Sequence, residues 1–190
     1  MPASPARSDL TDLLDDLFRA YAEDEASVRL RAMVLGPNLT GTTAGSLLRK
    51  AIIERCRDEG IQLAVPPEEP HLIRYAKKLQ GPTYNLCSYE LRLANECDMI
   101  VILPDSPGSF AEFGFFAWYD SGCAKSLVLI DRQHKDGKSF ISHGPKRASN
   151  QRGATIKYID YAQVDDAVAA VLQYATKKRA LRMDQRARGA

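Results

Sequence analysis

The sequence predicts an α/β fold: a flavodoxin/Rossmann-like parallel sheet of about five strands with helices on both faces. Short apolar runs alternate with stretches of helical spacing across residues 29–176, as in βαβ units with right-handed crossovers. The clearest junction lies within residues 98–119, where an apolar run stops at a turn of Pro, Asp, Ser and Gly and an apolar helix begins at once. A length of 190 residues suits one such domain with short extensions.

The individual elements follow from the same alternation. The predicted strands are the apolar runs 29–35, 61–65, 98–103, 126–130 and 155–159. The predicted helices cover about 46–57, 84–96 and 108–119, and a last helix begins near Val164. Residues 66–70 hold three prolines, which excludes regular structure there. Residues 71–83 are ambiguous, and residues 131–150 are expected to form a long polar connection.

Three parts are expected along the chain. Residues 1–25 are an N-terminal extension with an amphipathic helix at 9–22, residues 26–176 are the α/β domain, and residues 177–190 are a basic C-terminal tail. The apolar face of the first helix could pack on the domain or on a second subunit. The tail is either a solvated helix end or a surface for nucleic acid or an acidic partner.

The composition limits the class of protein. A hydrophobic content of 45% is typical of a chain that buries a core, and a net charge of +2 does not by itself indicate nucleic-acid binding. No apolar run approaches the roughly 20 residues of a membrane span, and the N-terminus lacks a signal-peptide stretch, so a cytoplasmic protein without a membrane segment is expected. The four widely spaced cysteines are predicted to be reduced and buried. No metal site is predicted, because the three histidines lie apart from one another and from the cysteines.

Glu112 is the main catalytic candidate. It is expected in the first turn of the helix after the third strand, and ligands of open α/β sheets bind at the carboxyl ends of the strands. Free backbone N–H groups in the turn at 105–109 would cradle an anion or ribose hydroxyls, and an ionised carboxylate there could attack an anomeric carbon or stabilise an oxocarbenium ion. The structural alternative is a carboxylate that only interacts with the helix dipole.

Each of the other candidates has a structural alternative as well. Glu90, on the helix before the third strand, is either a second acid of the cleft or a surface glutamate. Residues 36–38 are either a plain turn or a wall of the same cleft, because the first and third strands flank the switch point of a flavodoxin-like sheet. Residues 143–147 are either a solvated loop or a rim that contacts phosphate. The predicted substrate-binding residues are Gly36, Pro37, Asn38, Asp105, Ser106, Gly108, Ser109, His143 and Arg147.

The stretch 106–117, Ser-Pro-Gly-Ser-Phe-Ala-Glu-Phe-Gly-Phe-Phe-Ala, resembles the motif of nucleoside 2-deoxyribosyltransferases. The resemblance implies that Glu112 is the nucleophile and that Glu90 is the acid of the preceding helix, with Asp98 keeping the spacing. Gly36-Pro37 matches the Gly-Pro after that family's first strand. Asp105-Ser106 replaces the glycine pair of the lysine-decarboxylase-like nucleotide hydrolases, which makes this turn a poorer phosphate cradle.

A closer similarity is to the deoxyribosyltransferase-like toxin effectors of bacterial retron anti-phage systems. It is carried by residues 102–112 and resumes at 138–141, 144–145 and 147, and it covers roughly residues 29–160. The similarity implies cleavage of an N-glycosidic bond, with NAD or a related nucleotide as substrate rather than cofactor. It also implies a homo-oligomer and a retron or other defence-system partner.

NAD suits a site without an evident strong acid. Nicotinamide leaves as a neutral molecule, whereas loss of a purine usually needs protonation of the base. Two other functions are considered: base exchange between deoxynucleosides, and nucleotide sensing without catalysis.

The aromatic residues Phe113, Phe116 and Tyr119 could either pack in the core or contribute to a subunit interface.

Overall fold

The computed structural model describes residues 16, 19, 20, 23, 24, 27–64, 78, 86–135, 137 and 140–189. Its sheet has five strands: β1 (Arg31–Leu35), β2 (Gln62–Ala64), β3 (Met99–Ile102), β4 (Ser126–Asp131) and β5 (Thr155–Ile159). The spatial order is β2-β1-β3-β4-β5, and every neighbouring pair is parallel. This is the flavodoxin-like order, in which β1 and β3 flank the switch point. The predicted fold class is confirmed.

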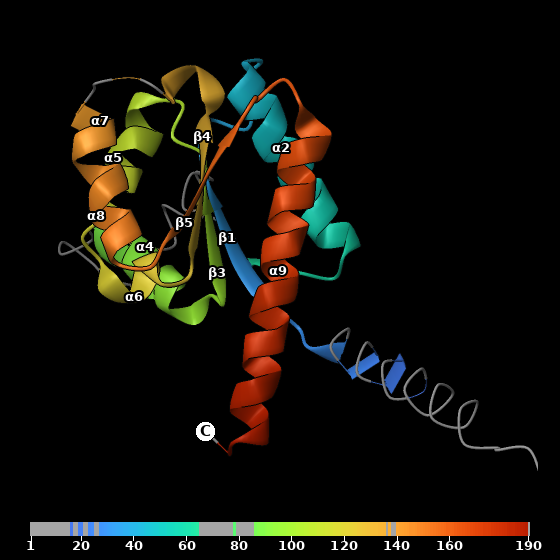
Figure 1. Cartoon of the computed structure of the whole chain (residues 1–190). Helices are drawn as coiled ribbons and strands as arrows, with labels where there is room; N and C mark the ends of the chain where they lie inside the picture. The colour runs from blue at the N-terminus through green and yellow to red at the C-terminus, as the bar shows by residue number, and fades with distance from the viewer. Residues whose placement is uncertain are drawn as a thin grey trace, which may run out of the picture.

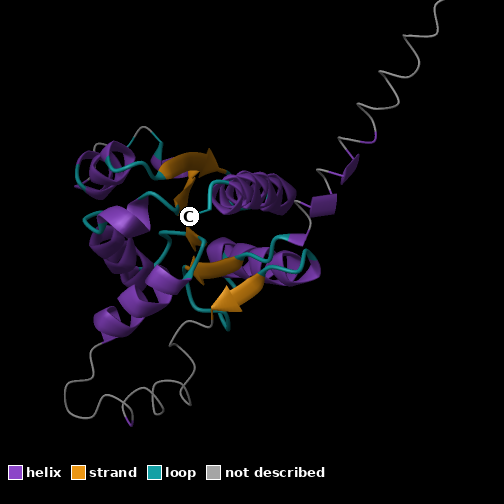
Figure 2. Cartoon of the chain, turned by 90° about the horizontal axis from the view of Figure 1, so that it is seen from below, coloured by secondary structure: helices purple, strands orange, loops and turns teal. Residues whose placement is uncertain are grey.

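Helices cover both faces of the sheet (Figure 1). The longer helices are α2 (Ala44–Asp58), α4 (Leu86–Glu96), α5 (Pro107–Phe116) and α9 (Val164–Ala187), and the shorter ones are α6 (Asp120–Cys123), α7 (Phe140–His143) and α8 (Pro145–Gln151). Helices α2 and α9 lie on one face and the others on the opposite face, an arrangement that Figure 2 shows along a second direction. Strand residues alternate between the faces, since Val34 and Val101 pack toward α2 and α9 while Met33 and Ile100 pack toward α4 and α5.

The structure corrects the connection predicted at 131–150. This segment contains a 3-10 turn, η2 (Arg132–His134), followed by α7 and α8. Helix α8 begins with Pro145 at its first position, where proline is favoured. Segments of three to seven residues are too short to show helical periodicity, which explains why the sequence pattern did not reveal them. Helix α5 is likewise shorter than predicted, ends at Phe116 and is followed by α6.

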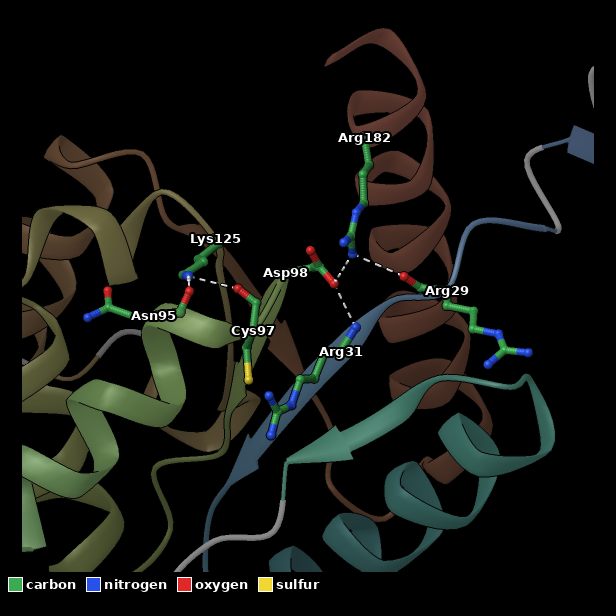
Figure 3. Close-up of polar contacts among 7 residues, drawn as sticks. All are labelled: Arg29, Arg31, Asn95, Cys97, Asp98, Lys125 and Arg182. Atoms are coloured by element: carbon green, nitrogen blue, oxygen red, sulfur yellow. Dashed lines mark hydrogen bonds and ion pairs between the residues drawn. The ribbon is translucent and has the colours of Figure 1, made fainter. Parts of the chain in front are cut away.

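Helix α9 continues unbroken to Ala187, through most of the segment expected to be a tail. Three of its basic side chains donate hydrogen bonds to backbone carbonyls of the domain: Lys178 to Ala124, Arg179 to Glu59 and Arg182 to Arg29. Arg182 also pairs with Asp98, as Figure 3 shows. These contacts fix the start of the basic segment against the amino edge of the sheet.

Some expectations concern residues outside the described part of the chain. The helix predicted at 9–22 lies mostly there, and so does most of 66–83. Within the described residues, no helix is long and apolar enough to cross a membrane. Cys56, Cys97 and Cys123 are buried as predicted, but Cys87 is exposed, so the prediction for that cysteine is wrong.

Candidate functional site

The candidate site lies at the carboxyl ends of β1 and β3. Leu103 follows β3 and donates its N–H to the carbonyl of Leu35 at 2.9 Å. A Cβ atom at Gly36 would stand 3.2 Å from the Cβ of Leu103, so the chain segments leaving the two strands are in direct contact. Asn38 is exposed, and its side-chain oxygen accepts hydrogen bonds from the N–H and hydroxyl of Thr40. The structure therefore brings residues 36–38 and the turn after β3 to one edge of the sheet, at the switch point.

Arg49 of α2 holds the end of β1 in place. Its side chain is 0% exposed. The guanidinium donates to the carbonyl of Val34 at 2.9 Å, to that of Gly36 at 3.0 Å and to that of Pro37 at 2.9 Å. A buried arginine needs such partners because burial removes its hydration. The sequence motifs do not point to Arg49, although it shares the helical spacing of the buried Ile52 and Cys56.

The turn after β3 is closed by its own serines. The hydroxyl of Ser109 accepts hydrogen bonds from the N–H groups of Asp105 and Ser106, at 2.9 and 2.8 Å. The hydroxyl of Ser106 accepts one from the N–H of Ser109, which completes a capping box at the start of α5. The N–H groups of Asp105, Ser106 and Ser109 are therefore used by the turn itself, so the expectation that they cradle an anion is wrong for these three. Space remains at Gly108, where a Cβ atom would meet nothing within 4 Å.

Glu112 is the sixth residue of α5 and lies in its second turn, not in the first as predicted. The helix dipole acts mainly within the first turn, so capping does not account for this residue. The side chain is half-buried, and its Oε2 atom is buried. Glu112 thus lies too far along α5 to be explained by capping, at a depth where its carboxylate is partly shielded from water.

Glu90 lies in the middle of α4 and is only 6% exposed. The alternative of a surface glutamate is therefore wrong. Its helical neighbours Leu93 and Ala94 belong to the core on the face of the sheet that α5 also covers, so Glu90 and Glu112 come from two helices of the same face (Figure 1). The sequence held a signal for this burial, because Glu90 shares the spacing of Leu93, Ala94 and Cys97.

Asp105 lies in the loop after β3, close to the start of α2 and to the end of β4. Its carboxylate accepts a hydrogen bond from the N–H of Gly45 in α2. Burial raises the pKa of Asp105, and the nearby carboxylate of Asp131 at the end of β4 raises it further, while His134 and the Gly45 N–H act in the opposite direction. The raising and lowering influences on Asp105 thus come from the start of α2, the loop after β3 and the end of β4. The sequence singled out Asp105 but not Gly45, Asp131 or His134.

His143 and Arg147 lie farther along the sheet. His143 ends α7 and is exposed. Arg147 lines a pocket of about 360 Å³ beside β5, together with Lys146 and Tyr158. The edge strand β5 is two strands away from β3, so the structure places Arg147 to one side of the switch point.

Comparison with known proteins gives two findings. The family model described as STM3845 retron effector protein matches residues 48–187 of the chain. A protein of Escherichia coli, described as a candidate ribosyltransferase/DNA-binding protein of retron Ec86, is 39% identical over 64 residues. That match covers 34% of this chain and 21% of the relative, so the chain aligns with about a fifth of that protein's length.

Proposed function

The chain belongs to the STM3845 retron effector family, and we propose that it is an N-glycoside hydrolase. Its substrate is NAD or a related nucleotide, and the bond cleaved is the one between base and ribose. The main support for the proposal is the position of Glu112. This half-buried glutamate lies in the second turn of α5, the helix that begins at the switch point of the sheet. A relative described as a candidate ribosyltransferase supports chemistry at a ribosyl carbon.

The proposed reaction starts with the C1′–N bond to nicotinamide. This bond breaks with its electron pair going to the ring nitrogen, which turns the pyridinium into neutral nicotinamide. Glu112 stabilises the ribosyl cation or bonds to C1′. A water molecule then bonds to C1′ and gives its proton to a carboxylate of the site, while Glu90 orients the sugar or this water. Where Glu112 has bonded to C1′, that C1′–O bond breaks in the same step and its electron pair returns to the Glu112 carboxylate. NAD serves as a substrate and not as a cofactor.

Base exchange between deoxynucleosides is a second candidate, and Asp105 favours it. Release of a purine needs a proton on the base, and Asp105 is a carboxyl group whose pKa is raised at the carboxyl edge. In this reaction a free base, rather than water, bonds to C1′ of the sugar held on Glu112. The C1′–O bond to Glu112 breaks with its electron pair returning to the carboxylate, and the incoming base gives its N–H proton to Asp105.

We propose further that the protein acts in the cytoplasm as a toxin effector of anti-phage defence, in a homo-oligomer and with a retron partner. Family membership supports the link to retrons. Trp118 lies in the turn after α5 and is 68% exposed; the guanidinium of Arg152 covers one face of its ring at 4.6 Å, and the remaining ring surface is available for contact with a second copy. Sedimentation of the purified chain tests the oligomer, and a monomer at working concentration would contradict it.

A substrate panel tests the reaction. The full chain is incubated with NAD, and separately with deoxyadenosine in the presence and absence of free hypoxanthine, and products are separated by chromatography. Release of nicotinamide and ADP-ribose from NAD supports the hydrolase. Formation of deoxyinosine only when hypoxanthine is added supports base exchange instead. Saturable binding of NAD without any product over hours would contradict both reactions and leave a sensing role.

A further inference from the structure

A basic pocket lies at the amino edge of the sheet, opposite the candidate site. It has a volume of about 400 Å³. Its lining residues come from the start of β3, the turn before β4 and helix α9: Asp98, Lys125, Lys178, Leu181, Arg182 and Gln185. The pocket therefore holds three cationic side chains and one carboxylate.

The carboxylate of Asp98 is already compensated. Its Oδ2 atom lies 2.6 Å from Nη1 of Arg182 and accepts a hydrogen bond from the N–H of Arg31 at 2.7 Å (Figure 3). Both contacts of Arg182, to Asp98 and to the carbonyl of Arg29, use the same nitrogen, although a guanidinium carries five N–H donors. Arg182 thus neutralises Asp98 and retains donors for another acceptor.

The two lysines have no carboxylate partner among the described residues. Lys125 donates to the carbonyl of Cys97 at 2.7 Å and to that of Asn95 at 3.2 Å. Lys178 donates to the carbonyl of Ala124 at 3.0 Å. Burial lowers the pKa of Lys178, and the charge of Lys125 lowers it further. The two ammonium groups therefore repel each other, and an anion between them would relieve this repulsion.

The charge of the pocket continues along α9. Residues 177–188 carry six cationic side chains and one anionic, whereas the whole chain has a net charge of only +2, so the remainder of the chain is net negative. Lys177, Arg186 and Arg188 are exposed, and Figure 1 shows the end of α9 extending beyond the sheet. These cations surround the last turns of α9 rather than forming one row, and together with the pocket they give this end of the helix a positive charge that suits several phosphates of a strand better than a single ion.

We propose that this pocket binds a phosphate group of a nucleic-acid backbone, and that the exposed cations of α9 contact the neighbouring phosphates. Ammonium and guanidinium groups around one space provide the charge-assisted hydrogen bonds that phosphate oxygens accept. Leu181, which is 55% exposed in the pocket wall, offers an apolar contact to a sugar or base. The site is separate from the proposed catalytic edge and does not depend on the glycosidase assignment.

The test is fluorescence anisotropy of the full chain with a labelled 20-nucleotide single strand and with a duplex, titrated over a range of salt concentrations. We expect Lys125→Gln/Lys178→Gln to weaken binding at least about tenfold at low salt and to lower the slope of log K against log salt by about one. The matched control is Lys157→Gln, a lysine of β5 that is bonded to Gln173 and lies outside the pocket; it should change binding less than about twofold.

Several outcomes would overturn the proposal. The first is that the chain binds neither the single strand nor the duplex. The second is that the double variant and the control lose the same amount of affinity for nucleic acid. The third is that the chain binds inorganic phosphate but no nucleic acid. Because both pocket lysines also bond backbone carbonyls, Lys177→Glu/Arg186→Glu is measured in parallel. Those two side chains are exposed, so reversing their charge should weaken nucleic-acid binding while leaving the midpoint of thermal unfolding unchanged.

Discussion

The carboxylate of Asp105 occupies the space that a side chain at Gly45 would need. A Cβ atom at position 45 would stand 2.1 Å from Oδ2 of Asp105, far inside a normal contact distance. The loop after β3 and the first turn of α2 are thereby fitted to each other across the switch point. The glycine is required for this contact and not for an unusual backbone angle, because it lies within a regular helix.

Gly45→Ala should therefore destabilise the protein, although alanine is the better helix former. The displaced Asp105 carboxylate is expected to lower the free energy of unfolding by about 1–3 kcal/mol and to reduce turnover. Gly114→Ala in α5 is the matched control, because a Cβ atom there would meet nothing within 4 Å. Urea denaturation should show this control to be as stable as the wild type or more so, and equal effects of both substitutions would contradict the account.

Asp105→Asn should stabilise the protein at neutral pH. A carboxyl group whose pKa is raised by folding binds its proton more tightly in the folded state, so its stabilising contribution is lost as the pH rises through that pKa. Asparagine keeps an acceptor for Gly45 and removes the charge. The gain over the wild type should grow between about pH 4 and about pH 7, to at most about 1 kcal/mol.

Chemical denaturation at several pH values measures this gain. Asp58→Asn, at an exposed position ending α2, is the control and should give no gain that depends on pH. A difference between Asp105→Asn and wild type that stays constant over the range would show that burial and Asp131 do not affect Asp105 as described.

Arg49→Met should cost about 3 kcal/mol of unfolding free energy, because it leaves the buried carbonyls of Val34, Gly36 and Pro37 without their donor. If the end of β1 forms part of the substrate site, KM for the nucleotide should rise more than kcat falls. Arg55→Met on the same helix removes only an exposed pair with Glu59 and should cost under about 1 kcal/mol. If both variants lose the same unfolding free energy, the role assigned to Arg49 is contradicted.

Thiol reactivity should distinguish one cysteine from the other three. Burial raises the pKa of Cys56 and of Cys97 to about 11, and also raises that of Cys123, so few thiolates form there near pH 8. Cys87 is exposed on α4. Ellman's reagent should modify one thiol in the native chain and four after denaturation, and Cys87→Ser should abolish the native reaction.

The strands were predictable because each is a short apolar run bounded by turn residues. The run 155–159 matches β5 residue for residue, and the other strands differ from their predictions by at most two residues at an end. The strand order could also be predicted from the sequence, because short connections and right-handed crossovers allow few sheet topologies. The small helices between β4 and β5 carried no comparable periodic signal.

The candidate site was predictable in its position but not in its contacts. Glu112 and Asp105 stand near a recognisable strand-to-helix junction, whereas Arg49 and Gly45 come from a helix more than fifty residues earlier. Only the folded chain brings these segments together. The use of the turn's N–H groups by Ser109 also depends on a side-chain rotamer, which the sequence pattern does not specify.

The most direct test of the central proposal is nicotinamide release from NAD by the wild type and by Glu112→Gln, with NAD binding measured on the same samples by calorimetry. Glu54→Gln, an exposed glutamate of α2, is the control. We expect Glu112→Gln to bind NAD with similar affinity but to release nicotinamide at least about a thousandfold more slowly, because the carboxylate acts on the transition state. Release by Glu112→Gln at the wild-type rate would contradict the assignment.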